Sequence, residues 1–198
     1  MRDLLNPEKA LIFRITHRNN LPWILANGLH CRNSNRLDSE FVSICNADLI
    51  ANRHYRAVPV SPGGSLSDYI PFYFTPLSMM SYNIKTGYRG VRQRSNEEIV
   101  ILVSSLRKLE RDGVRFLFTD RHAYLGYACY YNNLDDLSRI DWTILQQHDF
   151  KRDTKNPEKT DRYQAEALVH RHLPIASLLG IACYNVTERD NARRLARY

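Results

Sequence analysis

The sequence lacks a long apolar run, and this excludes a chain built around membrane-spanning helices. No stretch approaches the roughly 20 apolar residues that such a helix needs. Residues 1–11 also lack the apolar core of a secretory signal peptide, because four of them are charged: Arg2, Asp3, Glu8 and Lys9. We therefore expect a cytoplasmic protein that makes no membrane contact.

Cysteine is scarce as well, which argues against a fold stabilised by structural metal ions or by disulfide bonds. His170 and His172 are close in sequence but have no cysteine or aspartate companion, so a pair of surface histidines is the simpler interpretation. We expect no bound metal and reduced thiols, since the four cysteines are far apart and form no C-x-x-C pair: Cys31, Cys45, Cys129 and Cys183.

Several general catalytic motifs are missing. The sequence contains neither of the glycine-rich loops that cradle phosphates, G-x-x-x-x-G-K-[ST] and G-x-G-x-x-G, and it lacks the H-E-x-x-H and G-x-S-x-G patterns. General motifs therefore assign no reaction to this chain.

What the chain does have is an ordinary apolar content and an excess of positive charge. Its 198 residues, 43% of them hydrophobic, suit one globular domain over residues 1–198. The 28 Lys and Arg residues exceed the 21 Asp and Glu residues, which gives a net charge of +7. This balance favours a polyanionic partner such as nucleic acid, but it suits a basic protein without such a partner equally well.

Apolar and β-branched runs predict strands over residues 11–16, 99–103, 115–119 and 178–186. Residues 69–74 are also β-prone, but Pro71 cannot donate a main-chain hydrogen bond, which predicts an edge or irregular strand there.

Helical patterns are shorter and lie between the strands. Residues 20–28 predict a short amphipathic helix, and apolar residues recur at helical spacing over 134–147. Residues 165–169 fit either a helix or a strand, and Arg193 and Arg194 fall in a basic helix or tail. We expect an α+β fold without regular βαβ alternation, and functional or exposed loops over 30–68 and 149–163.

Four segments together resemble one family. In chain order they are Ile15-Thr-His17 with Asn20-Leu21; Val58-Pro-Val-Ser-Pro-Gly-Gly-Ser-Leu-Ser-Asp-Tyr-Ile-Pro-Phe-Tyr-Phe74; Phe118-Thr-Asp-Arg-His122; and Gln164-Ala-Glu-Ala-Leu-Val169. At these intervals the chain is similar to the DarT family of bacterial DNA ADP-ribosyltransferase toxins over roughly residues 11–186.

The resemblance implies a fold, a reaction and partners. The fold is that of single-domain ADP-ribosyltransferases, a split mixed or antiparallel sheet with peripheral helices. The implied reaction transfers ADP-ribose from NAD to a base in single-stranded DNA and releases nicotinamide, which blocks replication and suits phage defence. Thymine is favoured over guanine because the third and fourth segments look closest to that branch. A macrodomain antitoxin, DarG, is the implied protein partner.

The resemblance also implies catalytic residues. Glu166 matches the family's glutamate, and a carboxylate beside the ribose can stabilise the positive charge that develops as the nicotinamide bond breaks. Arg53 matches an essential arginine that holds either the pyrophosphate or the target base, although Arg56 fits the spacing too. His122 matches a histidine near the reacting centre.

Further residues are assigned to the two substrates. NAD is expected to contact Thr16, His17, Asn20, Arg53 and Tyr73. Basic residues interleaved with Tyr82 and Tyr88, together with the charged loop 149–163, suit the phosphates and bases of single-stranded DNA: Arg89, Arg92, Arg94, Lys151 and Arg152. Two other functions remain open, namely an ADP-ribosyltransferase that modifies RNA or protein and a basic nucleic-acid-binding module without catalysis.

Overall fold

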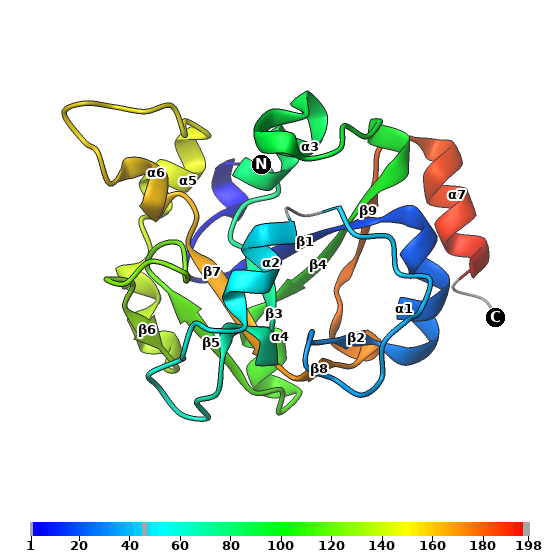
Figure 1. Ribbon diagram of the computed structural model, residues 1–198, viewed down its shortest axis with the longest axis horizontal. Coiled ribbons are helices and arrows are strands. Elements are labelled where there is room, and N and C mark those ends of the chain that lie inside the picture. Colours follow the sequence, from blue (N-terminus) through cyan, green and yellow to red (C-terminus); the bar gives the residue numbers. More distant parts are fainter. Residues whose placement is uncertain (1, 45–46, 196–198) are drawn as a thin grey trace.

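The computed structural model describes residues 2–44 and 47–195, so the predicted free thiol of Cys45 lies outside the described residues. Its centre is a seven-stranded sheet with the order β6-β5-β7-β3-β1-β4-β9, and every pair in it is antiparallel (Figure 1). The strands are β1 Leu11–His17, β3 Tyr69–Tyr73, β4 Ile99–Ser105, β5 Phe116–Thr119, β6 Tyr130–Tyr131, β7 Glu166–His170 and β9 Gly180–Cys183. The antiparallel α+β prediction is therefore confirmed.

The sheet is divided into two halves between β1 and β3. Seven consecutive residue pairs join β1 to β4, but a single pair, Phe13 with Tyr73, joins β1 to β3. Five pairs join β3 to β7 on its other side. The two halves therefore separate along most of the β1–β3 boundary.

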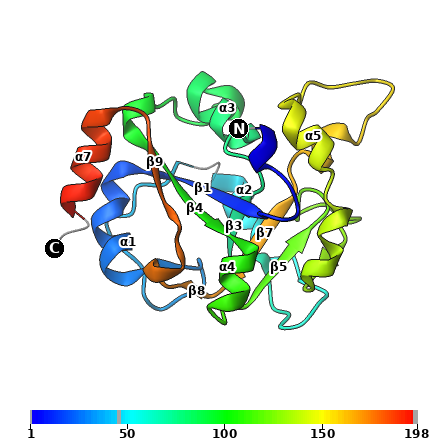
Figure 2. The ribbon, with the colours of Figure 1, turned by 180° about the vertical axis from the view of Figure 1, so that it is seen from behind.

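Helices surround the sheet, and a small second sheet pairs β2 (Leu29–His30) with β8 (His172–Leu173). Helices α1 and α7 lie side by side next to β9, and α4 packs against β4 (Figure 2). The helices are α1 Leu21–Asn27, α2 Ala47–Arg53, α3 Met79–Thr86, α4 Leu106–Arg111, α5 Trp142–Gln147, α6 Lys159–Arg162 and α7 Val186–Leu195. The chain also forms short 3-10 helices: η1 Arg2–Leu4, η2 Arg18–Asn20, η3 Leu66–Asp68, η4 Tyr88–Gly90, η5 Asn96–Glu98, η6 Leu134–Arg139 and η7 Ile175–Ser177.

The core lies between the sheet and its covering elements. Phe72, Leu102 and Phe118 are fully buried and come from three strands, and Leu106 of α4 and Leu145 of α5 pack onto the same cluster. The five apolar positions of 99–103 thus belong to an inner strand, β4, as the sequence predicts.

The sequence predicts an edge or irregular strand over residues 69–74, and the edge position is wrong. Strand β3 lies between β7 and β1, and proline is tolerated there because the two halves separate at this point. The carbonyl of Pro71 points to the β1 side, where it accepts a 2.8 Å hydrogen bond from the Arg14 guanidinium. The backbone nitrogen of Pro71, which carries no hydrogen, faces the same side, so the ladder between β3 and β7 loses no hydrogen bond.

Other segments refine the sequence-based prediction. Residues 165–169 are strand rather than helix, and the helical pattern of 134–147 is interrupted at Ile140, where the backbone is extended between η6 and α5. The loop 30–68 contains α2 and η3, which the sequence did not predict. In the loop 149–163 the charged residues up to Glu158 are exposed except Asp153, whereas those of α6 are partly buried, and Tyr163 is buried at 1% exposure. Arg193 and Arg194 lie in α7.

Candidate active site

Glu166 is the first residue of β7, and its side chain is only 2% exposed. One carboxylate oxygen, Oε2, accepts a 3.0 Å hydrogen bond from Nη1 of Arg53. The other oxygen, Oε1, accepts a 3.1 Å hydrogen bond from the backbone N–H of Ala123 and lies 3.8 Å from Nε2 of His122. The structure therefore brings together all three residues that the resemblance implies are catalytic.

These neighbours keep the buried carboxylate ionised. Burial raises the pKa of Glu166, but the positive charge of Arg53, that of the His122 ring when it is protonated, and the Ala123 N–H together outweigh it, so its pKa lies below the ordinary value. Burial lowers the pKa of His122 despite the nearby carboxylate. At neutral pH we therefore expect a charged Glu166 beside a neutral His122.

Arg53 reaches the carboxylate from the end of α2, and its side chain is 12% exposed. Its Nη2 atom is buried and has no hydrogen-bond partner within the described part of the chain. Arg53 thus holds Glu166 with one N–H group and has further donor capacity at the same point.

Thr119, at the end of β5, joins the backbone of Glu166 to the turn that carries His122. Its buried hydroxyl accepts a hydrogen bond from the Glu166 N–H at 3.2 Å and donates one to the carbonyl of Arg121 at 2.6 Å. The N–H of His122 donates to the carbonyl of Asp161 at 3.0 Å. The turn after β5 is therefore fixed against both β7 and α6.

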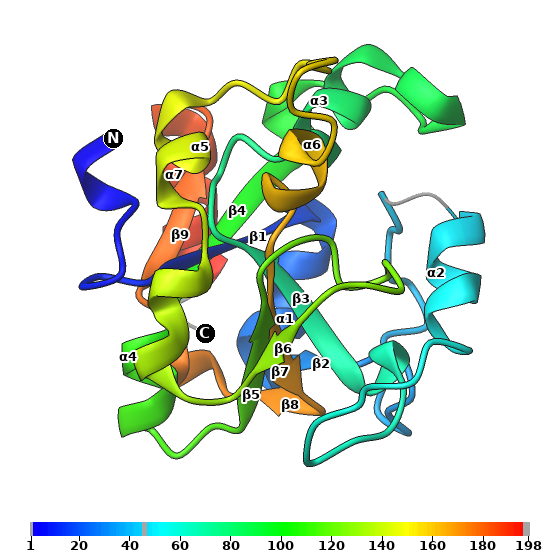
Figure 3. The ribbon, with the colours of Figure 1, turned by 90° about the vertical axis from the view of Figure 1, so that its left-hand side faces the viewer.

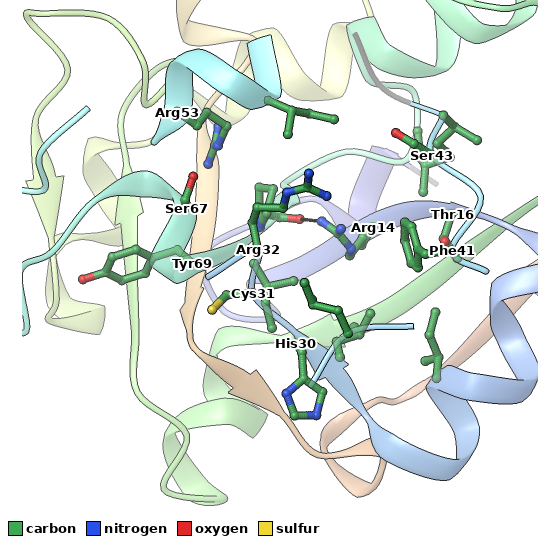
Figure 4. A pocket seen from close by; sticks show the side chains of 18 of the residues that line it. Arg14, Thr16, His30, Cys31, Arg32, Phe41, Ser43, Arg53, Ser67 and Tyr69 are labelled. Atoms are coloured by element: carbon green, nitrogen blue, oxygen red, sulfur yellow. Dashed lines mark hydrogen bonds between the residues drawn. The ribbon is translucent and has the colours of Figure 1, made fainter. Parts of the chain in front are cut away.

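A cavity of about 380 Å³ opens where β1 and β3 separate, and Figure 4 shows Arg14, Thr16 and Arg53 around it. Glu166 is also one of its lining residues. Of the residues predicted from the sequence to bind NAD, Thr16, Arg53 and Tyr73 line it. Two lining arginines, Arg14 and Arg32, were not predicted. Arg14 could have been noticed as the one charged residue within the apolar strand 11–16, whereas nothing in the sequence distinguishes Arg32.

His17 and Asn20 lie beside the cavity but are not among its lining residues. The His17 ring accepts a hydrogen bond from the Asn19 N–H at Nδ1, and its Nε2 is 3.4 Å from Glu98. The Asn20 amide donates to the Thr16 hydroxyl and to the Val42 carbonyl, each at 3.0 Å, and accepts from the Val42 N–H at 2.8 Å. Asn20 therefore holds the segment around Val42, from which several cavity residues come.

A second, wider groove of about 1390 Å³ adjoins the cavity and shares Tyr73, Met80 and His122 with it. It lies between α3 and the segment that leads into α6, which approach each other in Figure 3. Two of the predicted DNA-binding residues, Lys151 and Arg152, line it.

The other three predicted DNA-binding arginines lie elsewhere. Arg94 is largely buried and pairs with Glu98 at 2.9 Å, and Arg92 is exposed outside the groove lining. Arg89 belongs to η4, and its side chain is outside the described part of the structure. Aromatic rings also line the groove: Tyr82, Tyr88, Tyr124 and Phe150.

Residues 2–44 and 47–195 contain neither a candidate metal centre nor a membrane-spanning helix. No group of three or more His, Cys, Asp or Glu side chains in these ranges could hold a metal ion. No helix in them is long and apolar enough to cross a bilayer. Three cysteines there are free thiols: Cys31, Cys129 and Cys183.

Comparison with known proteins identifies the class to which this fold and site belong. A DNA ADP-ribosyl transferase of Escherichia coli O127:H6 is 55% identical over 181 residues, which cover 91% of this chain and 83% of that protein. The structure of Thermus sp. 2.9 DarT in complex with ADP-ribosylated ssDNA superposes with a TM-score of 0.88 at 34% identity, covering 96% of this chain and 89% of that one. The complex of the same protein with NAD⁺ gives 0.82 at 34% identity, covering 96% and 90%. The protein is an NAD-dependent DNA ADP-ribosyltransferase.

Within that class the family is specific. Residues 13–197 match the family described as "ssDNA thymidine ADP-ribosyltransferase, DarT". The chain belongs to the DarT family.

Proposed function

We propose that this protein transfers ADP-ribose from NAD to a thymine base of single-stranded DNA and that Glu166 is its catalytic carboxylate. One observation carries the proposal. A buried carboxylate, held ionised by Arg53, stands in the wall of a cavity of about 380 Å³. Guanine is the alternative base.

The chemistry needs a fixed negative charge at this place. When the bond between nicotinamide and ribose breaks, positive charge develops on the ribose. A preorganised carboxylate in a water-poor site stabilises that charge without having to reorganise. Glu166 can also accept a proton from the attacking base, directly or through a neighbour.

Arg53 acts at the reacting centre rather than at the pyrophosphate. Its guanidinium lies 3.0 Å from Glu166, and its buried Nη2 is left to donate to a bound substrate group. Two other cations line the cavity, Arg14 and Arg32, and we assign the pyrophosphate to them. His122 lines both the cavity and the groove, so we place it where the base meets the ribose.

The remaining NAD contacts follow from the cavity lining. Thr16 and Tyr73 face bound NAD, and the Tyr73 ring suits the flat nicotinamide. His17 and Asn20 act indirectly, because their polar atoms fix the end of β1 and the segment around Val42.

The wider groove is proposed to hold the DNA strand. Lys151 and Arg152 supply charge for phosphates there, and Tyr82 and Tyr88, which are 46% and 50% exposed, offer faces on which bases can stack. Arg89 and Arg92 belong to this proposal as contacts along the approach to the groove, and Arg94 as a residue that supports it through Glu98.

The biological setting is proposed from family membership. The protein acts in the cytoplasm as the toxin of a toxin–antitoxin pair, and a macrodomain antitoxin of the DarG type restrains it. Residues 1–198 form one ADP-ribosyltransferase domain. NAD is a co-substrate, and no metal takes part.

The function is tested by incubating the protein with NAD and a thymine-containing oligonucleotide in EDTA and weighing the products. We expect a mass increase of one ADP-ribose on the oligonucleotide, because positioning and electrostatics suffice for a substrate that already carries its leaving group. An oligonucleotide without thymine serves as the control, and its modification would favour guanine. A mass increase on added RNA or protein, or no transfer at all, would support one of the two other functions. Activity that EDTA removes and that magnesium or zinc restores would contradict metal independence.

Annealing a complementary strand to a good substrate is expected to suppress the modification strongly. Watson–Crick pairing hides ring atoms such as thymine N3, and extruding a base from a duplex costs a few kcal/mol. Rates on the single strand and the duplex are compared at several salt concentrations, and binding to the single strand is expected to weaken as salt rises. Equal rates on both substrates would contradict this prediction.

A further inference from the structure

The hydrogen bond from Ala123 to Glu166 depends on the connection between β5 and β6, residues 120–129. Ala123 is fully buried in this connection, and its N–H points to Oε1 of Glu166 at 3.1 Å. A main-chain donor can stay on a carboxylate only if the surrounding backbone is held in place. The structure shows what holds it.

Two side chains fix the connection by donating hydrogen bonds to its main-chain carbonyls. The hydroxyl of Tyr130 donates to the carbonyl of Ala123 at 2.5 Å. Nη2 of Arg56 donates to the carbonyl of Leu125 at 2.8 Å. Arg56 also lies against the Tyr130 hydroxyl: burial raises the pKa of this phenol, and the charge of Arg56 opposes the rise only in part. Both ends of the Ala123–Leu125 stretch are thus held by a hydrogen bond.

Arg56 is separate from the surfaces that would touch substrate. It lines neither the cavity nor the groove as defined by the described residues, although Leu125 lines the groove and Arg53, three residues earlier, lines the cavity. The end of α2 and the residues after it therefore direct two arginines to different places: Arg53 to the carboxylate and Arg56 to the backbone that supports it.

The segment after Arg56 is itself rigidly folded onto the same connection. The Leu66 N–H donates back to the carbonyl of Arg56 at 2.9 Å, and the Val58 N–H donates to that of Gly64 at 2.9 Å. Val58 and Leu66 then pack with Ala123 in a small buried cluster. Gly64 has a φ of +83°, and a Cβ there would lie 2.7 Å from Asp68, so this turn requires glycine.

We propose that Arg56 is a positioning residue for ADP-ribosyl transfer, and that Arg56 and Tyr130 together hold the Ala123 N–H on the Glu166 carboxylate. The inference rests on the proposed catalytic role of Glu166. Without this support the donor moves away, the carboxylate loses one of the contacts that fix its orientation, and its basicity rises.

The test compares Arg56→Met, Tyr130→Phe and the double variant with the unaltered protein. The matched control is Arg107→Met, because Arg107 also donates to main-chain carbonyls, those of Pro7 and Glu8, but on the surface of α4. Rates are measured against NAD concentration and pH, together with thermal melting.

We expect kcat to fall about tenfold in each of the two single variants, since the support of one charge-assisted hydrogen bond is removed. KM for NAD is expected to change little, and the acid limb of the pH profile to move to higher pH. The kcat of the double variant is expected to be no lower than that of the less active single variant, because the two side chains secure the same stretch. Arg56→Lys, which keeps the charge and a donor, should recover part of kcat.

Three results would overturn the inference. One is a folded Arg56→Met variant with unchanged kcat and pH profile. The second is a rise in KM for NAD at unchanged kcat, which would make Arg56 a direct substrate contact. The third is an equal loss in Arg107→Met.

Two further comparisons keep the test decisive. If Arg56→Met does not fold, Tyr130→Phe, which removes a single hydroxyl, carries the comparison. A fully active Glu166→Gln would instead contradict the proposed function, so the two failures are distinguishable.

Discussion

Replacing Glu166 by alanine is expected to reduce ADP-ribosyl transfer by about 10² to 10⁴, while the chain still folds. The carboxylate is 2% exposed and faces the cavity in which the ribose would develop positive charge. Removing a preorganised charge or a general base lowers the rate of a catalysed reaction by factors of this size. The measurement is single-turnover transfer to a thymine-containing oligonucleotide, with cooperative melting as the check on folding.

Glu166→Gln separates charge from shape. Glutamine keeps an oxygen that can accept from the Ala123 N–H, but it lacks the negative charge that Arg53 meets. We expect it to be nearly as inactive as the alanine variant. Glu110→Gln, on the exposed surface of α4, serves as the matched control and should be fully active. A soluble, normally melting Glu166→Ala protein with near-normal transfer would disprove the assignment.

Replacing Arg53 by methionine is expected to lower transfer at neutral pH by on the order of 10² and to move the acid limb of activity to higher pH. In the unaltered protein, Arg53 opposes the effect of burial on the pKa of Glu166. Without it burial is opposed only by the His122 ring and the Ala123 N–H, so the pKa of Glu166 rises and the carboxylate takes up a proton at higher pH.

The lowered pKa of Glu166 also predicts how the stability of the folded chain depends on pH. Because the pKa of Glu166 is lower in the folded than in the unfolded chain, its stabilising contribution is present above the ordinary glutamate pKa and is lost as pH falls through the folded value. In Arg53→Met that contribution should be smaller, because the pKa of Glu166 in the folded chain is higher. Transfer rates and melting temperatures are measured together from pH 4 to 8. Arg111→Met, exposed at the end of α4, is the control. An unchanged acid limb in a folded Arg53→Met protein would contradict this account.

Much of the fold could be predicted because strand patterns are local. The apolar runs at 11–16, 99–103 and 115–119 are strands, and the α+β class followed from their distribution. The position of β3 could not be predicted, since Pro71 reads as an edge residue unless the separation of β1 and β3 is known. Likewise, α2 has only seven residues and forms in a largely polar segment without clear periodicity.

Only those parts of the site whose side chains match the family could be predicted from the sequence. Glu166, Arg53 and His122 were named from the sequence, and the structure places them in contact. The Ala123 donor was out of reach, because a main-chain N–H carries no residue signature. Arg56 could not be told apart from Arg53 by spacing, since their different directions depend on how α2 ends.

The single residue pair between β1 and β3 has a consequence for how such a protein can diversify. Each half of the sheet completes its own ladder of main-chain hydrogen bonds, so the gap between the halves is bounded mainly by side chains. Substitutions along that gap can widen, narrow or recharge the cavity without breaking either ladder. A change in what the pocket accepts is therefore separable from a change in the scaffold, and substrate preference can drift among descendants while the architecture stays the same.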